Sequence, residues 1–85
     1  MDALLSAEDH IPNREAMAAF LVRLREDHER HGVEWENQTL DGFLEALGAW
    51  IADAQGSYAN LEQELPPDGD WTFFARALNA ARNYE

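Results

Sequence analysis

Three residues that favour the N-cap of a helix, Asn13, Thr39 and Asp70, each stand before a run of apolar residues at helical spacing. No run of the sequence shows the strict alternation of apolar and polar residues that is typical of a half-buried strand. The pattern therefore predicts an all-α domain, a small bundle of three main helices. We expect these helices over residues 14–31, 40–59 and 71–83.

Each expected helix carries apolar residues that recur three or four positions apart and therefore share one face. In the first helix the stripe consists of Met17, Phe20, Leu21, Leu24 and His28. In the second it consists of Leu40, Leu44, Leu47, Ile51, Ala54 and Tyr58, with Phe43 and Trp50 beside it. In the third it consists of Trp71, Phe74, Ala75, Leu78 and Ala81. These stripes are the predicted core.

The second helix also carries small residues at four-residue steps, Gly48, Ala52 and Gly56, on the side opposite its stripe. Small side chains let another backbone approach closely, although glycine lowers helix propensity. We expect this helix to be central and packed on two sides. The alternative interpretation is a groove for self-association.

Residues 1–85 are short enough for one domain with one small core. The segment 1–12 contains Leu4, Leu5 and Ile11 and ends at Pro12. It is either a short N-terminal helix or a lead-in segment that packs on the core.

Charge is strongly unbalanced, because 17 carboxylates face only 6 cationic side chains, all of them arginine, for a net charge of −11. Nucleic-acid binding requires a cationic footprint, so we expect no nucleic-acid partner. Anionic lipid is disfavoured for the same reason. The field of such a surface favours a basic protein partner instead.

The sequence contains no cysteine, no basic and apolar leader, and no apolar run of membrane-spanning length, so a cytoplasmic protein is expected. His28 and His31 are three residues apart and could share a metal, but Arg30 lies between them and C-terminal helix positions favour such residues anyway. Carboxylate pairs such as Asp41 and Glu45 are too common in this chain to indicate catalysis. We expect no catalytic residues, no cofactor, no metal and no enzymatic activity.

Trp35 lies in the polar connector between the first two helices. A tryptophan there either covers the ends of two amphipathic helices or is an exposed anchor for a partner, since interface hot spots favour tryptophan. Asn37 is suited to hydrogen bonds with backbone groups around the turn.

The connector and the second helix carry a motif that runs Trp35-Glu36-Asn37-x-Thr39-Leu40-x-x-Phe43-Leu44-Glu45-Ala46-Leu47-x-Ala49-Trp50-Ile51-x-Asp53. It continues with Gly56, Tyr58, Asn60, Trp71, Phe74-Ala75, Leu78, Ala80-Ala81 and Tyr84-Glu85. Over roughly residues 13–85 the chain resembles a family of small bacterial domains of unknown function (DUF7660-like). The resemblance implies an intact small helical domain and supplies no catalytic or cofactor-binding residues.

The leading hypothesis for function is a small acidic module that binds or masks a basic protein, in the manner of an immunity protein or inhibitor. The candidate contact residues are Trp35, Glu36, Asp41, Glu45 and Asp53. One alternative is a structural accessory domain, in which a homodimer is possible. A further alternative is a DNA mimic, whose carboxylates would be spaced like phosphates.

Overall fold

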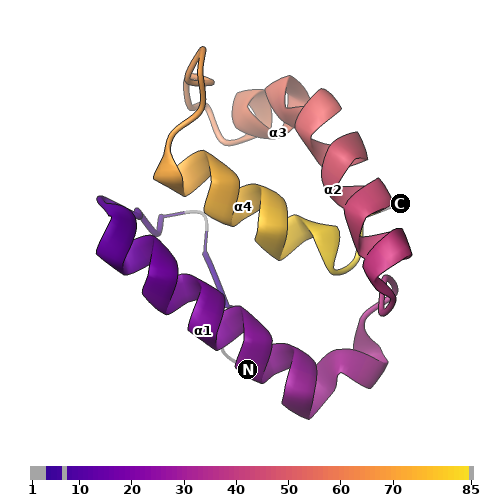
Figure 1. The fold of residues 1–85 in the computed structure, drawn as a ribbon. Helices are drawn as coiled ribbons and strands as arrows, with labels where there is room; N and C mark the ends of the chain where they lie inside the picture. Colours follow the sequence, from indigo (N-terminus) through magenta and orange to yellow (C-terminus); the bar gives the residue numbers. More distant parts are fainter. Residues whose placement is uncertain (1–3, 7, 85) are drawn as a thin grey trace.

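The computed structural model describes residues 4–6 and 8–84. Four α-helices and one short 3-10 helix make up its regular structure (Figure 1). In chain order they are α1 Arg14–His31, η1 Gly32–Glu34, α2 Leu40–Ala52, α3 Ala54–Asn60 and α4 Trp71–Ala81. The described residues contain no strand, so the predicted all-α class is confirmed.

All three predicted N-caps are confirmed. The side chain of Asn13 accepts a hydrogen bond from the backbone of Ala16 at 2.9 Å. Thr39 and Asp70 accept equivalent bonds, at 3.0 Å and 2.7 Å, from the third residue after each cap. Each bond satisfies a backbone N–H that has no partner within its own helix, which is why the helix starts could be located from the sequence.

The helix in the centre of the fold is α4, which packs against both α1 and α2 (Figure 1). Our expectation that the second predicted helix would be central and packed on two sides is therefore wrong. Three buried alanines, Ala75, Ala77 and Ala81, let the neighbouring helices approach α4 closely. The small residues Gly48 and Gly56 lie instead where an added Cβ atom would meet nothing within 4 Å.

Two apolar clusters form the core. The first joins α1, the connector, the N-terminal segment and α4 around Leu5, Ile11, Met17, Phe20, Leu24, Trp35 and Ala75. The second joins α2, α3 and α4 around Trp50, Ala54, Tyr58, Phe73 and Ala77. Phe20 is fully buried, and its ring therefore contributes its whole apolar area to the first cluster.

The N-terminal segment is a lead-in that packs on the core. Leu5 and Ile11 are buried, and the Ile11 backbone donates to the Thr72 hydroxyl at 2.8 Å. The described residues of 1–12 form no helix, although a turn bond joins Asp9 to Ser6. Part of this prediction falls on residues 1–3 and 7, which lie outside the described residues.

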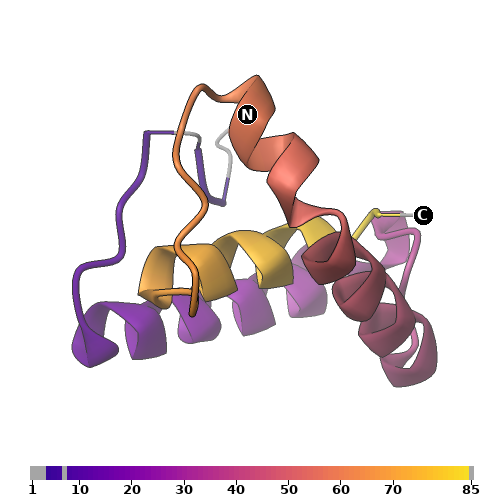
Figure 2. The same cartoon turned by 90° about the horizontal axis from the view of Figure 1, so that it is seen from above.

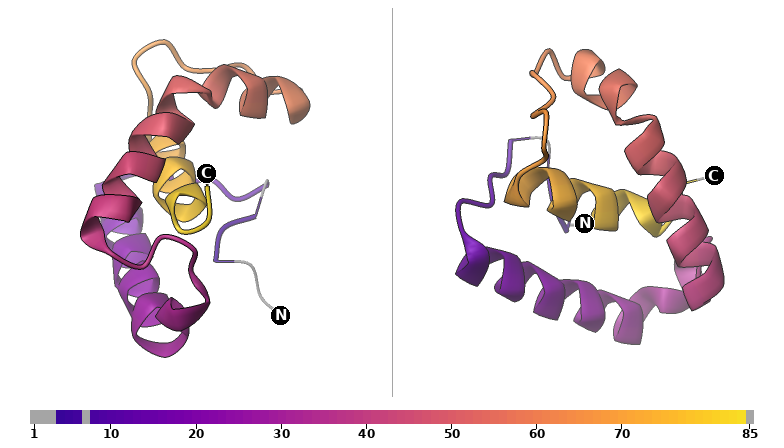
Figure 3. Two further views of the ribbon diagram at one scale, coloured as in Figure 1. Left: turned by 90° about the vertical axis from the view of Figure 1, so that its right-hand side faces the viewer. Right: turned by 45° about the horizontal axis from the view of Figure 1, so that its top comes forward.

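The predicted second helix is two helices that meet at Asp53 and point in different directions (Figures 2 and 3). The backbone of Asp53, at φ −98° and ψ 7°, departs from helical geometry. This single-residue break contains neither proline nor glycine, which are the signals by which sequence inspection recognises the end of a helix. The third predicted helix, expected to reach residue 83, ends at Ala81.

The faces predicted for all three helices are partly wrong. On α1, Met17, Phe20 and Leu24 are buried as predicted, but Leu21 and His28 are exposed. Trp71 and Phe74 are each 43% exposed, while Phe73 and Thr72 are buried. The buried residues of α2 are Ala46 and Trp50; of the predicted leucines, Leu47 packs against the core, while Leu40 and Leu44 are exposed. On α4 the adjacent residues Phe73 and Phe74 could each face the core, and α2 is apolar on most of its circumference. The spacing of apolar residues is therefore compatible with more than one buried face on each helix.

Candidate functional site

The outward side of α2 carries an exposed apolar stripe. Leu40 is 73% exposed, Leu44 is 54% exposed and Ile51 is 41% exposed. Their spacings of four and seven residues place them on one face of the helix. We call these three residues the outer stripe.

The outer stripe is exposed because the fold uses another face of α2. Trp50 is buried against Phe73 of α4, with 5.7 Å between the ring centroids, and Phe43 stacks on Trp35 at 5.9 Å. These aromatic contacts bury more apolar area per residue than a leucine does. The aromatic face therefore turns inward, and the leucine face remains at the surface.

Two of the predicted contact residues, Asp41 and Glu45, are exposed on α2 beside the outer stripe. At 100° per residue, Gly48 lies between Leu44 and these carboxylates around the helix. We call Asp41 and Glu45 the acidic border. The structure thus brings an apolar stripe and two carboxylates together on a single rigid helix.

Glu36, a third predicted contact residue, is exposed in the connector before α2. Its backbone N–H donates to the side chain of Asn83 at 3.1 Å, which holds this part of the connector against the end of α4. Asn37 also holds the connector to the end of α4, because its side-chain amide donates to the carbonyls of Ala81 at 3.0 Å and Tyr84 at 2.8 Å. The expected backbone role of Asn37 is confirmed.

Asp53 lies at the junction of α2 and α3, where its carboxylate accepts a hydrogen bond from the Tyr84 hydroxyl at 2.5 Å. This bond raises the pKa of Tyr84 above its ordinary value, because the hydroxyl that donates to a carboxylate resists deprotonation. Asp53 is exposed, but its carboxylate already joins the helix junction to the C-terminal residues. Asp53 is therefore not part of the acidic border, because it lies at the end of α2 and its carboxylate is bonded to Tyr84.

Trp35 belongs to the core, because only 7% of it is exposed. Its indole N–H donates to Asp27 at 2.8 Å, and the same carboxylate oxygen accepts from Arg82 at 3.1 Å. Of the two interpretations of Trp35, the structure shows the one in which it covers the helix ends. A buried ring whose polar atom is already bonded offers little surface to a partner, so we no longer count Trp35 among the contact candidates.

His28 and His31 each contact a neighbouring side chain. His28 packs edge-on against Trp35, with 5.0 Å between ring centroids, and the Nδ1 atom of His31 lies 3.4 Å from a Glu34 oxygen. Within residues 4–6 and 8–84, no group of three or more histidines and carboxylates is placed to hold a metal ion.

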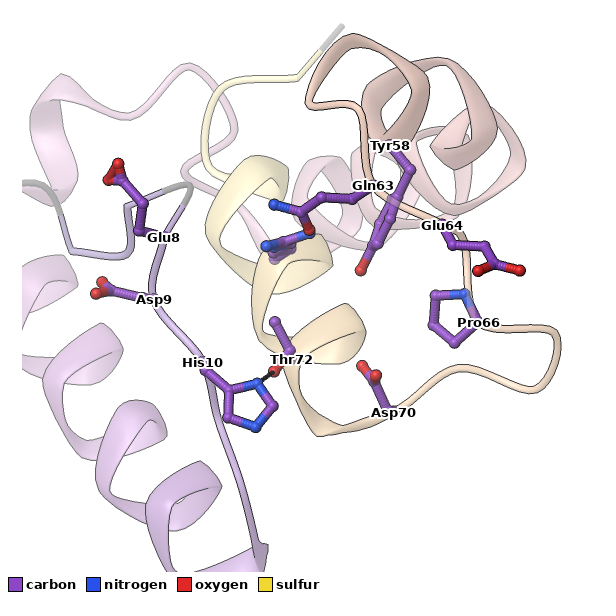
Figure 4. A pocket seen from close by; sticks show the side chains of 10 residues that line it. Glu8, Asp9, His10, Tyr58, Gln63, Glu64, Pro66, Asp70 and Thr72 are labelled. Carbon is purple, nitrogen blue, oxygen red and sulfur yellow. Dashed lines mark hydrogen bonds between the residues drawn. The ribbon is translucent and has the colours of Figure 1, made fainter.

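A polar cavity of about 360 Å³ lies between the N-terminal segment, the loop after α3 and α4 (Figure 4). Its lining includes carboxylates from two separate segments, Glu8 and Asp9 on one side and Glu64 and Asp70 on the other. Sequence inspection missed this cavity, because its residues come from three segments that share no motif.

Inside the cavity, the Arg76 guanidinium lies 4.9 Å from the centre of the Tyr58 ring. Burial raises the pKa of the Tyr58 hydroxyl, and the charge of Arg76 partly opposes that rise. The Thr72 hydroxyl lies 3.2 Å from Nδ1 of His10. This hydroxyl also accepts the Ile11 bond that ties the N-terminal segment to α4, so the same contacts that line the cavity hold the fold together.

None of the helices in the described part of the chain is both long and apolar enough to cross a bilayer. The protein is a small all-α domain in which one helix presents leucines and carboxylates to solvent. It belongs to the family described as a family of unknown function (DUF7660), whose model matches residues 13–85. This match confirms the resemblance seen in the sequence. Neither the curated proteins nor the solved structures contain a match to this chain.

Proposed function

We propose that this domain is a non-enzymatic interaction module that binds a basic protein through the outward side of α2. The observation that carries the proposal is the outer stripe of Leu40, Leu44 and Ile51 beside the acidic border of Asp41 and Glu45. Apolar side chains that become buried on association supply affinity, and neighbouring charges supply rate and selectivity.

The charge of the partner follows from the charge of the domain. Six arginines cannot neutralise 17 carboxylates. Arg82 is committed to Asp27 in a mostly buried pair, which leaves still less positive charge for the surface. A cationic partner is attracted by this field, and association is expected to be fast and sensitive to salt. Masking of a cationic site on that partner, as an inhibitor or immunity protein does, is the form of binding we favour.

A homo-oligomeric accessory domain is the second candidate, and the open surface at Gly48 and Gly56 is the observation that favours it. Two copies that pair through the same surface would bring two acidic borders into one interface. Repulsion between the two acidic borders would weaken such a dimer, so a basic partner fits this surface better than a second copy does.

The test begins with capture of partners from the lysate of the source organism, at low and at near-physiological salt. A dominant basic protein that dissociates as salt rises is the expected result. Its affinity, measured with purified proteins, should fall when Glu45 is replaced by lysine. Glu29→Lys is the matched control, because Glu29 is exposed on α1 and its reversal changes the net charge equally. Equal effects of both changes, or capture of acidic proteins alone, would contradict the proposal.

A further inference from the structure

The outer stripe has the shape of a helix-docking ridge. The rise from Leu40 to Ile51 is about 16 Å at 1.5 Å per residue, or about three helical turns. Because all three side chains project from one helix, the ridge is close to straight. A straight ridge of this length matches the groove between side-chain rows on another helix.

Gly48 provides a depression beside the outer stripe, into which a packed helix fits. It lies between the stripe and the acidic border, and an added Cβ atom would meet nothing within 4 Å. A glycine at this place in an exposed helix lowers helix propensity, and no contact within the described chain requires it. It does allow the backbone or a side chain of a partner to approach α2 more closely than any larger residue would.

Within α2, the charged residues lie on one side of the outer stripe only. The acidic border runs along the Gly48 side, while the other side of the stripe adjoins the aromatic face of α2 that packs into the core. A partner that fits must therefore carry apolar residues at helical spacing and cations along one flank. A second copy of this chain fails this requirement, because each copy has a net charge of −11 and its α2 offers carboxylates where cations are needed.

We infer that the occupant of the outer stripe is a basic amphipathic helix of the partner protein, packed over Gly48 with its arginines or lysines along Asp41 and Glu45. This inference rests on the proposed function and adds the docking mode to it. The helix-in-groove mode predicts that contact at Gly48 limits affinity, whereas a purely electrostatic association would depend on the carboxylates and not on Gly48.

The experiment uses the full chain and a synthetic peptide of about 18 residues, which is long enough for five helical turns. The peptide carries leucines at helical spacing and arginines on one flank. A second peptide replaces the arginines with glutamine, and a third has the first composition in shuffled order. Dissociation constants are measured by fluorescence anisotropy at near-physiological salt against the natural chain, Gly48→Met and Ala19→Met.

Gly48→Met keeps the net charge and raises helix propensity, and its Cβ atom meets nothing within 4 Å in the fold. Thermal unfolding of this variant, measured beside the natural chain, separates lost binding from lost stability. Ala19→Met makes a similar addition at an exposed position of α1. The expected result is binding of the arginine peptide that weakens by about tenfold or more in Gly48→Met and changes less than about twofold in Ala19→Met. The glutamine and shuffled peptides should each bind more weakly than the arginine peptide.

Equal affinity in Gly48→Met and the natural chain would overturn the docking mode while leaving a basic partner in place. Equal affinity of the arginine and glutamine peptides would overturn the basic character of the occupant, and with it the proposed function, even if Gly48→Met still weakened binding. Absence of binding by all three peptides would overturn the inference. A dimer in sedimentation that Gly48→Met dissociates would also overturn it, because the occupant would then be a second copy.

Discussion

Asn37 makes two hydrogen bonds to residues more than forty positions away, and its replacement tests how the connector is held to α4. The amide of Asn37 donates to the carbonyls of Ala81 and Tyr84, both of which lie at or beyond the last turn of α4. Carbonyls at a helix C-terminus lack partners within the helix. Asn37→Ala therefore removes two donors at once and leaves two acceptors to be satisfied by water.

The expected loss follows from the value of each bond. A protein hydrogen bond contributes about 0.5–1.5 kcal/mol net, so Asn37→Ala should lower the free energy of unfolding by about 1–3 kcal/mol. A domain of this size is stabilised by only about 4–13 kcal/mol in total. A loss of about 2 kcal/mol should lower Tm by roughly 8–16 °C.

The assay is urea denaturation followed by tryptophan fluorescence and helical circular dichroism. Asn60→Ala is the control, because Asn60 is exposed at the end of α3, and its replacement should change stability by less than about 0.5 kcal/mol. Asn37→Asp should destabilise the domain more than alanine does at neutral pH, since it places a carboxylate beside two carbonyl oxygens. Equal stability of Asn37→Ala and Asn60→Ala would refute the reasoning.

Three further predictions concern the core, the outer stripe and the C-terminal tyrosine. Phe20→Ala should lower the free energy of unfolding, measured by chemical denaturation, by about 3–5 kcal/mol, because the ring is fully buried. A loss below about 1 kcal/mol would contradict its place in the core. Leu44→Gln should change the free energy of unfolding by less than about 0.5 kcal/mol, because Leu44 is exposed. A loss of several kcal/mol would mean that this leucine is packed in the core. The pKa of Tyr84 is raised above 10.0 by its bond to Asp53, so the stability from that bond is present below pH 10 and is lost as pH rises through the folded pKa. Tyr84→Phe should therefore be less stable than the natural chain at pH 8, and the difference should shrink at alkaline pH; a difference independent of pH would exclude this role for the bond.

Local signals in the sequence were sufficient to locate the helix starts. Asn13, Thr39 and Asp70 bond to backbone groups three residues away, so their effect does not depend on the rest of the fold. The resemblance to the family was equally accessible, because its spaced aromatic residues are visible without a structure.

The choice of buried faces depended on tertiary packing and could not be predicted. On α2 either the leucine face or the aromatic face could be buried. Trp50 is buried because it packs against Phe73 of α4, a contact that cannot be seen in the sequence. The break at Asp53 could not be predicted either, because neither proline nor glycine stands at the residue where the backbone departs from helical geometry.

The candidate site was predicted in part. Asp41 and Glu45 were chosen for their charge and are exposed, but the leucines beside them were assigned to the core. A functional surface that contains apolar residues follows the same helical period as a buried one, so only the structure distinguishes the two.

The most direct test of the proposed docking surface places a photo-activated cross-linking residue at position 44 and, in a control chain, at position 19, inside cells of the source organism. Both positions are exposed on helices, at Leu44 of α2 and Ala19 of α1. The account predicts that position 44 becomes joined to a basic helical segment of one protein, while position 19 gives no such product. Products from position 19 alone, or a product in which position 44 is joined to a second copy of the chain, would contradict it.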